Sequence, residues 1–283
     1  MTRVSADTKL QIMTKGIDIS TGGMLALLHQ LKTLLYLDAL TISGLTLGQE
    51  LAKASPLAVP RELSCIQPFD EPLYPKSSLV VLKGNLAPGG AVIKASASKN
   101  RKLLNHSGRA VVFSNSEDMT RRIDSPDLDV KHDDILVLQN IGPVGNPGMP
   151  EAGMIPIPRK LSAKGVDDMM RISDGRMSGT AGGTIVLHVS PEAADPSSVL
   201  GIIQNGDIIS LKVEEGTLNV NIAEEEISRR KQSRLESLGQ AGGPWLERES
   251  MRGYRGLYMR SVTQAENGAD FDFLRADGPS KSQ

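Results

Sequence analysis

The sequence has few cysteines and few aromatic residues. Cys65 is the single cysteine in 283 residues, which excludes an intramolecular disulfide, a CxxC redox pair and an all-cysteine zinc or iron–sulfur site within the chain. One Trp, four Tyr and four Phe provide little surface for stacking nucleic-acid bases. The histidines are scattered without an HxxxH pair, so their spacing does not indicate zinc; they are His29, His106, His132 and His188.

The sequence also has almost no net charge and no long apolar run. Its 32 Lys and Arg and 33 Asp and Glu leave a formal net charge of −1, which gives no electrostatic reason to expect a nucleic-acid partner. Lys32 and Asp38 interrupt the most apolar stretch, residues 24–40, so we expect no membrane span. Met1 is not followed by the apolar core of a signal peptide. We therefore expect an intracellular protein, cytoplasmic or mitochondrial.

The residues that are present describe a globular chain with two regions. Hydrophobic residues make up 39% of the sequence and charged residues 23%, a balance that is unlike that of a disordered chain. Helical spacing of apolar residues predicts a helix near residues 27–35 and a shorter one over 46–54. Prolines between positions 55 and 75 then end any helix. We expect a helical segment over residues 1–60 and a β-rich domain over 61–283.

From about residue 78, short apolar runs alternate with glycine-containing turns. These runs predict strands over residues 78–82, 90–94, 108–113, 134–138, 184–189, 207–211 and 217–220, the last two as a hairpin. Helices are expected over residues 116–123, 164–171 and 224–238. The predicted fold class is α/β, with a β-rich barrel or sandwich surrounded by helices.

A loop rich in glycine and proline, residues 142–151, follows the fourth predicted strand. Such a composition predicts a rigid loop whose backbone can approach a ligand closely. Glu151 is its only ionisable side chain, and a carboxylate there could bind a hard cation such as Mg²⁺. A structural turn with a solvated glutamate is the alternative, and the pattern alone leaves both open.

A second glycine-rich segment, residues 173–183, contains Ser178. A serine on a tight turn exposes its hydroxyl, which could act as a nucleophile, or as a base if donors or a metal stabilised its alkoxide. The spacing matches neither a GxSxG elbow nor a Walker A loop, and a plain turn is the alternative. His188, in the strand that follows, is expected to be a core histidine with its hydrogen bonds satisfied.

Five segments in a fixed order resemble the dihydroxy-acid and sugar-acid dehydratase family, which includes dihydroxy-acid dehydratase, phosphogluconate dehydratase and aldonic-acid dehydratases. They are LKGNLAP at 82–88, GMPE at 148–151, SDGRMSGT at 173–180, HVSPEA at 188–193 and NGDII at 205–209. The resemblance covers about residues 22–274. It implies a β-barrel-like C-terminal domain of the swivelling type with surrounding helices, preceded by a short helical remnant of the N-terminal domain.

The resemblance also implies an activity and a site. Enzymes of this family remove water from a 2,3-dihydroxy acid to give a 2-keto-3-deoxy acid, with Mg²⁺ and an iron–sulfur cluster as cofactors. By motif match, Ser178 takes the position of an alkoxide base and Glu151 that of a Mg²⁺ ligand. Met177 and residues 252–274 resemble the sugar-acid branch, whose substrates are polyhydroxy acids. Branched-chain 2,3-dihydroxy acids are the alternative substrate, and a homo-oligomer is implied for the intact enzyme.

The same resemblance implies what the sequence lacks. In the family, the cysteines that bind the cluster and the Asp and Lys that complete the magnesium site belong to an N-terminal domain. Cys65 lies outside any cluster-ligand motif, so the cluster ligands are absent from this chain. We therefore expect a truncated dehydratase. The alternatives are a half-protein that assembles with a cluster-bearing partner and a non-catalytic binding or regulatory homologue.

Overall fold

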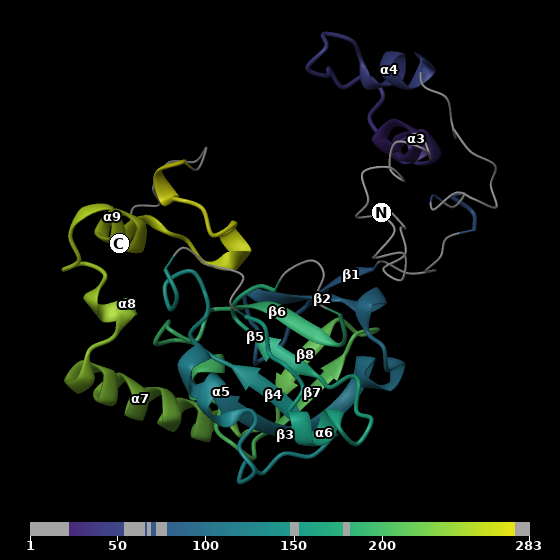
Figure 1. Cartoon of the computed structure of the whole chain (residues 1–283). Coiled ribbons are helices and arrows are strands. Elements are labelled where there is room, and N and C mark those ends of the chain that lie inside the picture. The colour runs from purple at the N-terminus through teal and green to yellow at the C-terminus, as the bar shows by residue number, and fades with distance from the viewer. Residues whose placement is uncertain are drawn as a thin grey trace. The chain divides into compact units, whose positions relative to one another are not determined.

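The computed structural model describes residues 23–53, 66, 69–71, 78–147, 153–177 and 182–274, and the chain divides into two units between Ser78 and Leu79 (Figure 1). The described part of the first unit is helical, with α3 (Gly23–Gln30), the 3-10 helix η1 (Lys32–Leu34) and α4 (Leu47–Lys53). Thr46 fixes the start of α4, because its hydroxyl accepts the Gln49 N–H and the Gln49 side chain accepts the Thr46 N–H in return. Both helices predicted in this region are therefore present.

The second unit is built on one eight-stranded mixed sheet, in which the strands follow the order β1-β2-β6-β5-β4-β3-β7-β8. The four strands in the middle, β6, β5, β4 and β3, run parallel, and every other pair is antiparallel. The strands are β1 (Leu79–Leu82), β2 (Gly90–Lys94), β3 (Asn105–Phe113), β4 (Ile135–Leu138), β5 (Arg171–Ser173), β6 (Ile185–Ser190), β7 (Ile208–Lys212) and β8 (Thr217–Val220).

The two edge strands of this sheet meet, so that the sheet nearly closes into a barrel (Figure 1). The Lys83 N–H donates to the Gly216 carbonyl at 2.8 Å, and the Lys83 carbonyl accepts the Leu218 N–H at 2.9 Å. The Asn85 amide extends the junction by bonding both the N–H and the carbonyl of Val220. The predicted α/β class and barrel-like architecture are confirmed.

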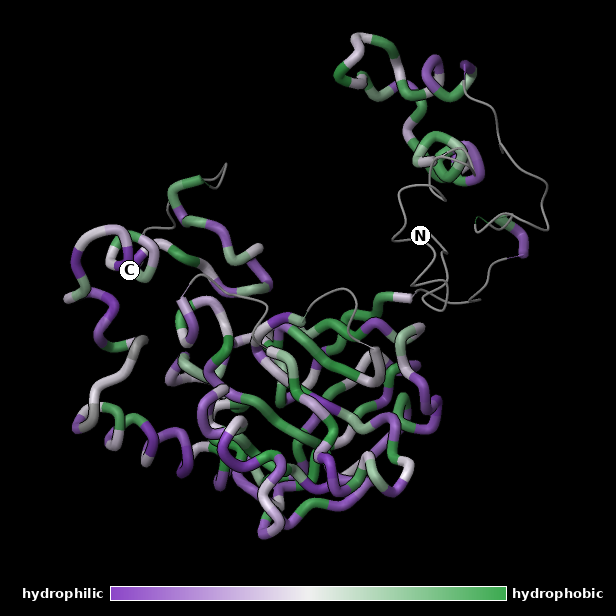
Figure 2. The backbone as a smooth tube through the Cα atoms, in the orientation of Figure 1, coloured by the Kyte–Doolittle hydropathy of each residue, from purple (hydrophilic) through white to green (hydrophobic). Residues whose placement is uncertain are grey.

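The barrel separates two hydrophobic clusters, one on each face of the sheet. Along β3, Ala110 and Val112 belong to the cluster that lines the barrel interior, while Val111 and Phe113 belong to the outer cluster. This alternation follows from the period of two in a strand. Figure 2 shows the strands as mostly hydrophobic tube, with more hydrophilic tube along α7. Burial on both faces explains why a central parallel strand such as β4 appears in the sequence as a continuous apolar run.

Helices and 3-10 turns join the strands of the barrel or follow β8, its last strand. They are η3 (Ala95–Ala97), η4 (Arg101–Leu104), α5 (Ser116–Arg122), α6 (Arg159–Ser162), η5 (Leu200–Ile202), α7 (Glu224–Ala241), α8 (Pro244–Glu247), α9 (Gly253–Ser261), η6 (Ala265–Asn267) and η7 (Asp272–Leu274). Met119 of α5 and Leu161 of α6 pack into the outer cluster. None of the helices in the described part of the chain has the length and hydrophobicity that a membrane-spanning segment requires.

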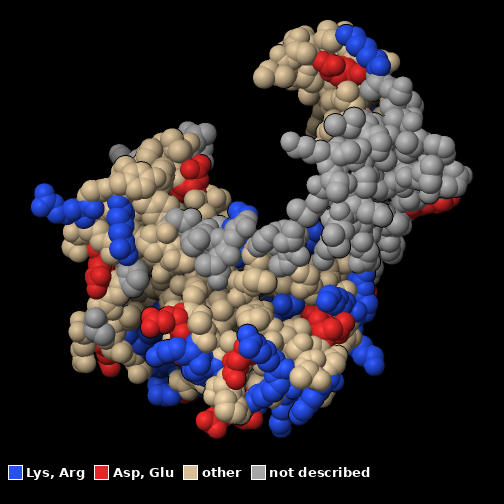
Figure 3. All heavy atoms as spheres, in the orientation of Figure 1, with Lys and Arg blue, Asp and Glu red and all other residues tan. Residues whose placement is uncertain are grey.

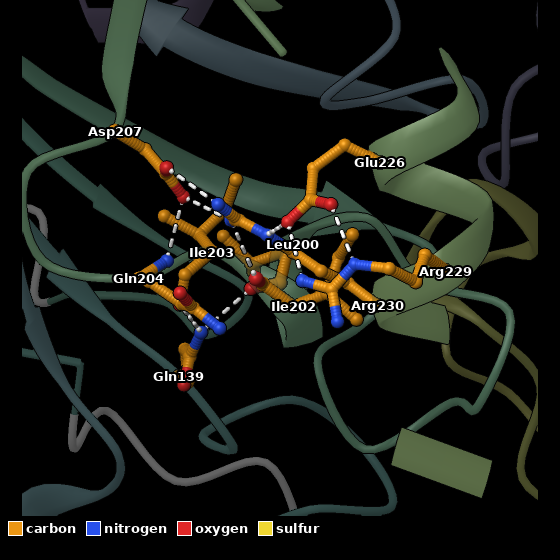
Figure 4. Close-up of polar contacts among 9 residues, drawn as sticks. All are labelled: Gln139, Leu200, Ile202, Ile203, Gln204, Asp207, Glu226, Arg229 and Arg230. Atoms are coloured by element: carbon orange, nitrogen blue, oxygen red, sulfur yellow. Dashed lines mark hydrogen bonds and ion pairs between the residues drawn. The ribbon is translucent and has the colours of Figure 1, made fainter. Parts of the chain in front are cut away.

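Arg230 is one of the residues that fix the long helix α7 to the barrel (Figure 4), together with Arg234, which bonds the carbonyls of Ala193 and Asp195. The Arg230 guanidinium reaches Asp207, at the start of β7, with contacts of 2.6 and 3.1 Å, and also bonds Glu226 on its own helix. Arg230 and Asp207 are both largely buried, whereas Arg229 beside them is mostly exposed. On the face shown in Figure 3, acidic side chains lie among the basic ones over the barrel.

The helix predicted over residues 164–171 is wrong, because this segment leads into β5. Met169 belongs to the outer cluster and Met170 to the barrel interior, and both are fully buried. Neighbouring residues are buried on opposite faces when the backbone is extended, as it is in a strand between β4 and β6. The helix in this region, α6, is a short one that ends at Ser162.

Candidate functional site

The candidate site lies at the carboxyl ends of the parallel strands β4, β5 and β6. Residues 139–158 follow β4, residues 174–184 follow β5, and residues 191–195 follow β6. Carboxyl ends of neighbouring parallel strands meet at the same edge of a sheet, which is where ligands bind in many α/β proteins. The first of these loops includes Glu151 and the second includes Ser178.

Glu151 and Ser178, the predicted site residues, both lie outside the described residues, as does Cys65. The role of Ser178 as a base and that of Glu151 as a metal ligand therefore stay predictions. The structure describes the residues that flank both segments.

The flanks of the two loops are hydrogen-bonded to each other. Gly153, two residues after Glu151, donates its N–H to the carbonyl of Arg176 at 3.0 Å, two residues before Ser178. A Cβ atom at position 153 would lie 2.7 Å from that carbonyl oxygen, so the close approach requires glycine. The described structure thus joins the loop after β4 to the loop after β5.

A buried guanidinium joins the C-terminal parts of the same two loops. Arg171, at the start of β5, donates to the Ile155 carbonyl at 3.1 Å and to the Gly182 carbonyl at 2.9 Å. It also contacts Asp168 at 3.4 Å, whose carboxylate accepts the N–H of Thr184 at 2.8 Å. Arg171 and Asp168 are both buried, so the hydrogen bonds that hold the two loops at this end are shielded from solvent.

A fully buried carboxyl group, that of Asp174, connects the ends of all three strands. It accepts the N–H groups of Asn140 at 3.1 Å and Ile141 at 2.9 Å, after β4, and of Ala193 at 2.7 Å, after β6. Asn140 has a φ of 58°, a left-handed conformation that asparagine tolerates better than most residues. Burial raises the pKa of Asp174 to about 6, although these N–H donors partly offset the shift.

A second buried carboxyl group, that of Glu192, holds the next turn of the loop after β4. It accepts the N–H groups of Val144 and Gly145 and the amide of Gln264, which comes from the C-terminal region. Burial raises the pKa of Glu192 to about 7; its N–H donors oppose the shift, and the nearby charge of Asp174 adds to it. Asp174 and Glu192 are thus two buried carboxyl groups that anchor the start of the loop that contains Glu151.

His188 lies at a bulge in β6 and differs from the predicted core histidine. Opposite β2, the register shifts between Gly90 and Val92, and His188 adopts a φ of 54°. Its N–H donates to the Gly175 carbonyl at 3.1 Å, but its Nδ1 atom is buried and has no hydrogen-bond partner among the described residues. Burial, and then the charge of Arg176, lower the pKa of His188, so the imidazole is neutral at pH 7.

The described residues do not provide a metal or cluster site. Within the described ranges, no three His, Cys, Asp or Glu side chains come together as metal ligands. The oxygens of Asp174 and Glu192 already accept N–H groups, so these carboxylates are committed to the protein backbone. One cysteine in the sequence cannot hold an iron–sulfur cluster. The donors that the structure describes therefore do not fit either cofactor.

Asp174 and Glu192 lie in two of the segments that carry the family resemblance, but no role was predicted for either residue. Each is a single acidic residue among Ser, Gly, Pro or Ala next to a buried strand. That isolation is the signal that could have found them, because a lone acidic residue in an apolar environment requires specific donors. The identity of the donors, backbone N–H groups 19 to 48 residues away, is visible in the structure.

Comparisons with known proteins identify the family of this chain. The sequence model of the dihydroxy-acid/6-phosphogluconate dehydratase C-terminal family matches residues 64–269. The chain is 43% identical over 258 residues to 6-deoxy-6-sulfo-D-gluconate dehydratase from Pseudomonas putida, an alignment that covers 90% of this chain and 42% of that protein.

Two further relatives have different substrates in their names. L-arabonate dehydratase from Azospirillum brasilense is 43% identical over 238 residues, which cover 84% of this chain and 39% of the relative. Dihydroxy-acid dehydratase from Caldicellulosiruptor saccharolyticus is 38% identical over 251 residues, which cover 88% of this chain and 42% of the relative. The chain thus spans about two fifths of the length of these curated relatives. From the matched family model, the chain belongs to the dihydroxy-acid/6-phosphogluconate dehydratase family, in the region of its C-terminal domain.

Proposed function

We propose that this chain takes part in the dehydration of a 2,3-dihydroxy acid of the sugar-acid type to a 2-keto-3-deoxy acid. Family membership supports a dehydratase, and two of the relatives named above act on sugar acids by name. The observation that carries the proposal is the hydrogen bond between Gly153 and Arg176, because it joins the loops in which Glu151 and Ser178 occur.

In the proposed reaction, Ser178 as an alkoxide removes the proton from C2 of the acid, and the 3-hydroxyl group leaves as hydroxide. The proton that Ser178 took up converts the hydroxide to water, which regenerates the alkoxide. One C–H and one C–O bond break, and a C2–C3 double bond forms. The resulting enol becomes the ketone when C3 gains a proton. The glycines around Ser178 support the proposal, because backbone N–H groups can stabilise an oxyanion.

Mg²⁺ and an iron–sulfur cluster remain proposals on family grounds, with Glu151 as a Mg²⁺ ligand. We assign no step to either cofactor, because the described residues do not hold them. A homo-oligomer is likewise proposed for the active enzyme. A half-protein that needs a cluster-bearing partner, and a non-catalytic binding homologue, are the competing functions; branched-chain 2,3-dihydroxy acids are the competing substrates, since one relative is a dihydroxy-acid dehydratase.

The test is an assay of the purified chain for 2-keto acid formation, with iron and acid-labile sulfide measured in the same sample. L-arabonate, 6-deoxy-6-sulfo-D-gluconate and a branched-chain 2,3-dihydroxy acid are the substrates. Ser178→Ala should abolish turnover, whereas Ser197→Ala, at an exposed serine, should keep it. Turnover that survives Ser178→Ala would reject Ser178 as the base.

Lack of turnover together with lack of iron and sulfide would reject catalysis by the chain alone. Calorimetric titration of the same acids then separates the remaining functions. Binding that disappears in Glu151→Gln supports a half-site that needs a partner, and the absence of binding to all three acids rejects these acids as ligands.

A further inference from the structure

The loop that leaves β4 makes one tight turn before it continues toward Glu151. The Asn146 N–H donates to the Gly142 carbonyl at 2.9 Å, which closes the turn. Inside it, the N–H groups of Val144 and Gly145 both point at one carboxylate oxygen of Glu192, at 3.0 and 2.8 Å. Glu192 is 1% exposed, so these bonds are shielded from water.

The fit between this turn and Glu192 is specific to a glycine at position 142. A Cβ atom there would lie 2.6 Å from a carboxylate oxygen of Glu192 and 2.7 Å from its Cβ. A larger residue would have to displace the carboxylate, since real Cβ atoms do not approach so closely. The shape of the turn therefore fits the Glu192 carboxylate. A side chain that only filled space in the core would not need so close a fit.

Glu192 is itself held by Gln264, which lies between α9 and η6. The Gln264 side-chain amide N–H donates at 2.8 Å to the other carboxylate oxygen of Glu192, which also accepts the Val144 N–H at 3.1 Å. The side-chain carbonyl of Gln264 accepts the Glu192 N–H at 2.8 Å. Gln264 thus fixes both the backbone and the side chain of Glu192. Through this pair, a residue far along the chain is connected to the loop after β4.

We propose that Glu192, held by Gln264, is a positioning residue for the loop that leads from β4 to Glu151. Glu192 directs where that loop leaves the sheet, and the C-terminal segment around Gln264 sets the orientation of Glu192. The inference rests on the proposed function, in which Glu151 acts at the far end of this loop. It assigns to Glu192 and Gln264 a role that is separate from base or metal-ligand chemistry.

Amide hydrogen exchange of the chain itself tests the proposal without any cofactor. Glu192→Gln replaces one acceptor oxygen by an N–H₂ group that faces N–H donors, so we expect the Val144 and Gly145 amides to exchange about tenfold faster. Gln264→Ala should act in the same direction but less strongly. Asn267→Ala, at an exposed residue of the same segment, is the matched control and should leave both amides unchanged.

A pH profile of the same two amides separates positioning from general stability. In the wild type, their NMR shifts should follow the titration of Glu192, whose pKa is about 7, with Asp174 as the charged neighbour. In Glu192→Gln, the NMR shifts of the two amides should not change over this pH range. If Glu192→Gln does not fold, the pH profile of the wild type and the amide exchange rates of Gln264→Ala still test the proposal.

Unchanged exchange at Val144 and Gly145 in both variants, or amides that do not titrate in the wild type, would overturn the proposal. These outcomes are independent of the proposed function. If the amides respond as expected while Glu151→Gln leaves acid binding or turnover intact, then the proposed role of Glu151 fails and the anchoring by Glu192 stands.

Discussion

At the candidate site, burial and hydrogen bonding have opposite effects on the pKa values of two carboxyl groups, those of Asp174 and Glu192. Burial disfavours the charged form of Asp174 and Glu192, whereas the N–H groups that point at them favour it. The balance brings both pKa values into the range near neutrality. A protein that buries two carboxyl groups beside one loop therefore makes the stability of that loop depend on pH.

The pH dependence of stability at Glu192 has a definite sign. Its pKa in the folded protein, about 7, lies above the ordinary value of 4.5, so folding favours the protonated form. The resulting stabilisation is complete below about pH 4.5 and is lost as the pH rises to about 7, with a magnitude on the order of 3 kcal/mol at 1.4 kcal/mol per pKa unit.

Glu192→Gln should lack this dependence, because glutamine does not titrate. Urea unfolding of both proteins between pH 4.5 and 8 measures the effect, and the stability of the wild type relative to the variant should fall as the pH rises. Parallel stability curves for the two proteins would show that the pKa of Glu192 is not raised.

His188 should titrate below the ordinary histidine pKa of 6.5, because burial and the charge of Arg176 both disfavour the imidazolium. An NMR titration of the ring Cε1 proton measures this midpoint. A His188 midpoint at or above 6.5 would contradict the expected environment.

At the scale of elements, closure of the barrel depends on Gly84. A Cβ atom there would lie 2.1 Å from the Leu218 carbonyl oxygen, where β8 meets the residue after β1. We expect Gly84→Ala to lower the free energy of unfolding by about 3 kcal/mol, the upper end of the usual cost of overpacking. Gly239→Ala is the control, because a Cβ on that α7 residue meets open space and alanine favours helices. Equal midpoints of unfolding for Gly84→Ala and the wild type would contradict the closed junction.

The attachment of α7 provides a second test at this scale. Arg230→Met leaves the largely buried Asp207 without its cation, which should cost about 3 kcal/mol of stability. Arg229→Met, at a mostly exposed arginine, should cost less than about 1 kcal/mol. Chemical denaturation of both variants measures the difference. Similar losses in the two variants would mean that burial does not govern this ion pair.

Most strands of the barrel could be predicted from the sequence, and β5 could not. Runs such as Ile135–Leu138 are apolar throughout because the strand is buried on both faces. β5 has three residues, with Arg171 and Ser173 on either side of Ile172, so it is too short and too polar to show a period. The burial of Arg171 depends on Asp168 and on carbonyls of two separate loops, and such long-range partners leave no local pattern.

At the candidate site too, residue types could be predicted from the local sequence, but their long-range partners could not. Motif resemblance predicted Ser178 and Glu151 as site residues, and these assignments stay predictions. The anchors Asp174 and Glu192 received no role, since their donors are main-chain N–H groups of another loop. Side-chain types can be read from a sequence, but main-chain donors are available at nearly every position and become specific only through the fold.

At the scale of the whole molecule, the second unit has a core of its own. Both hydrophobic clusters take all their buried members from between Leu82 and Ile227. A fragment of residues 79–274 should therefore unfold cooperatively, with a Tm within a few degrees of that of the same unit in the full chain. Calorimetry of the fragment and the full chain makes the comparison. A fragment without a cooperative transition would show that the unit needs residues before position 79.

The junction between the two edge strands has a consequence for how the chain is made. Asn85 bonds Val220 across 135 positions of sequence, so the contact that completes the barrel joins residues that are synthesised far apart in time. Until β8 has left the ribosome, the outer edge of β1 has no strand to pair with, and such an edge can pair with another chain. Slow, late closure of this kind accompanies high contact order. The junction that stabilises the finished barrel therefore leaves an unpaired strand edge during synthesis.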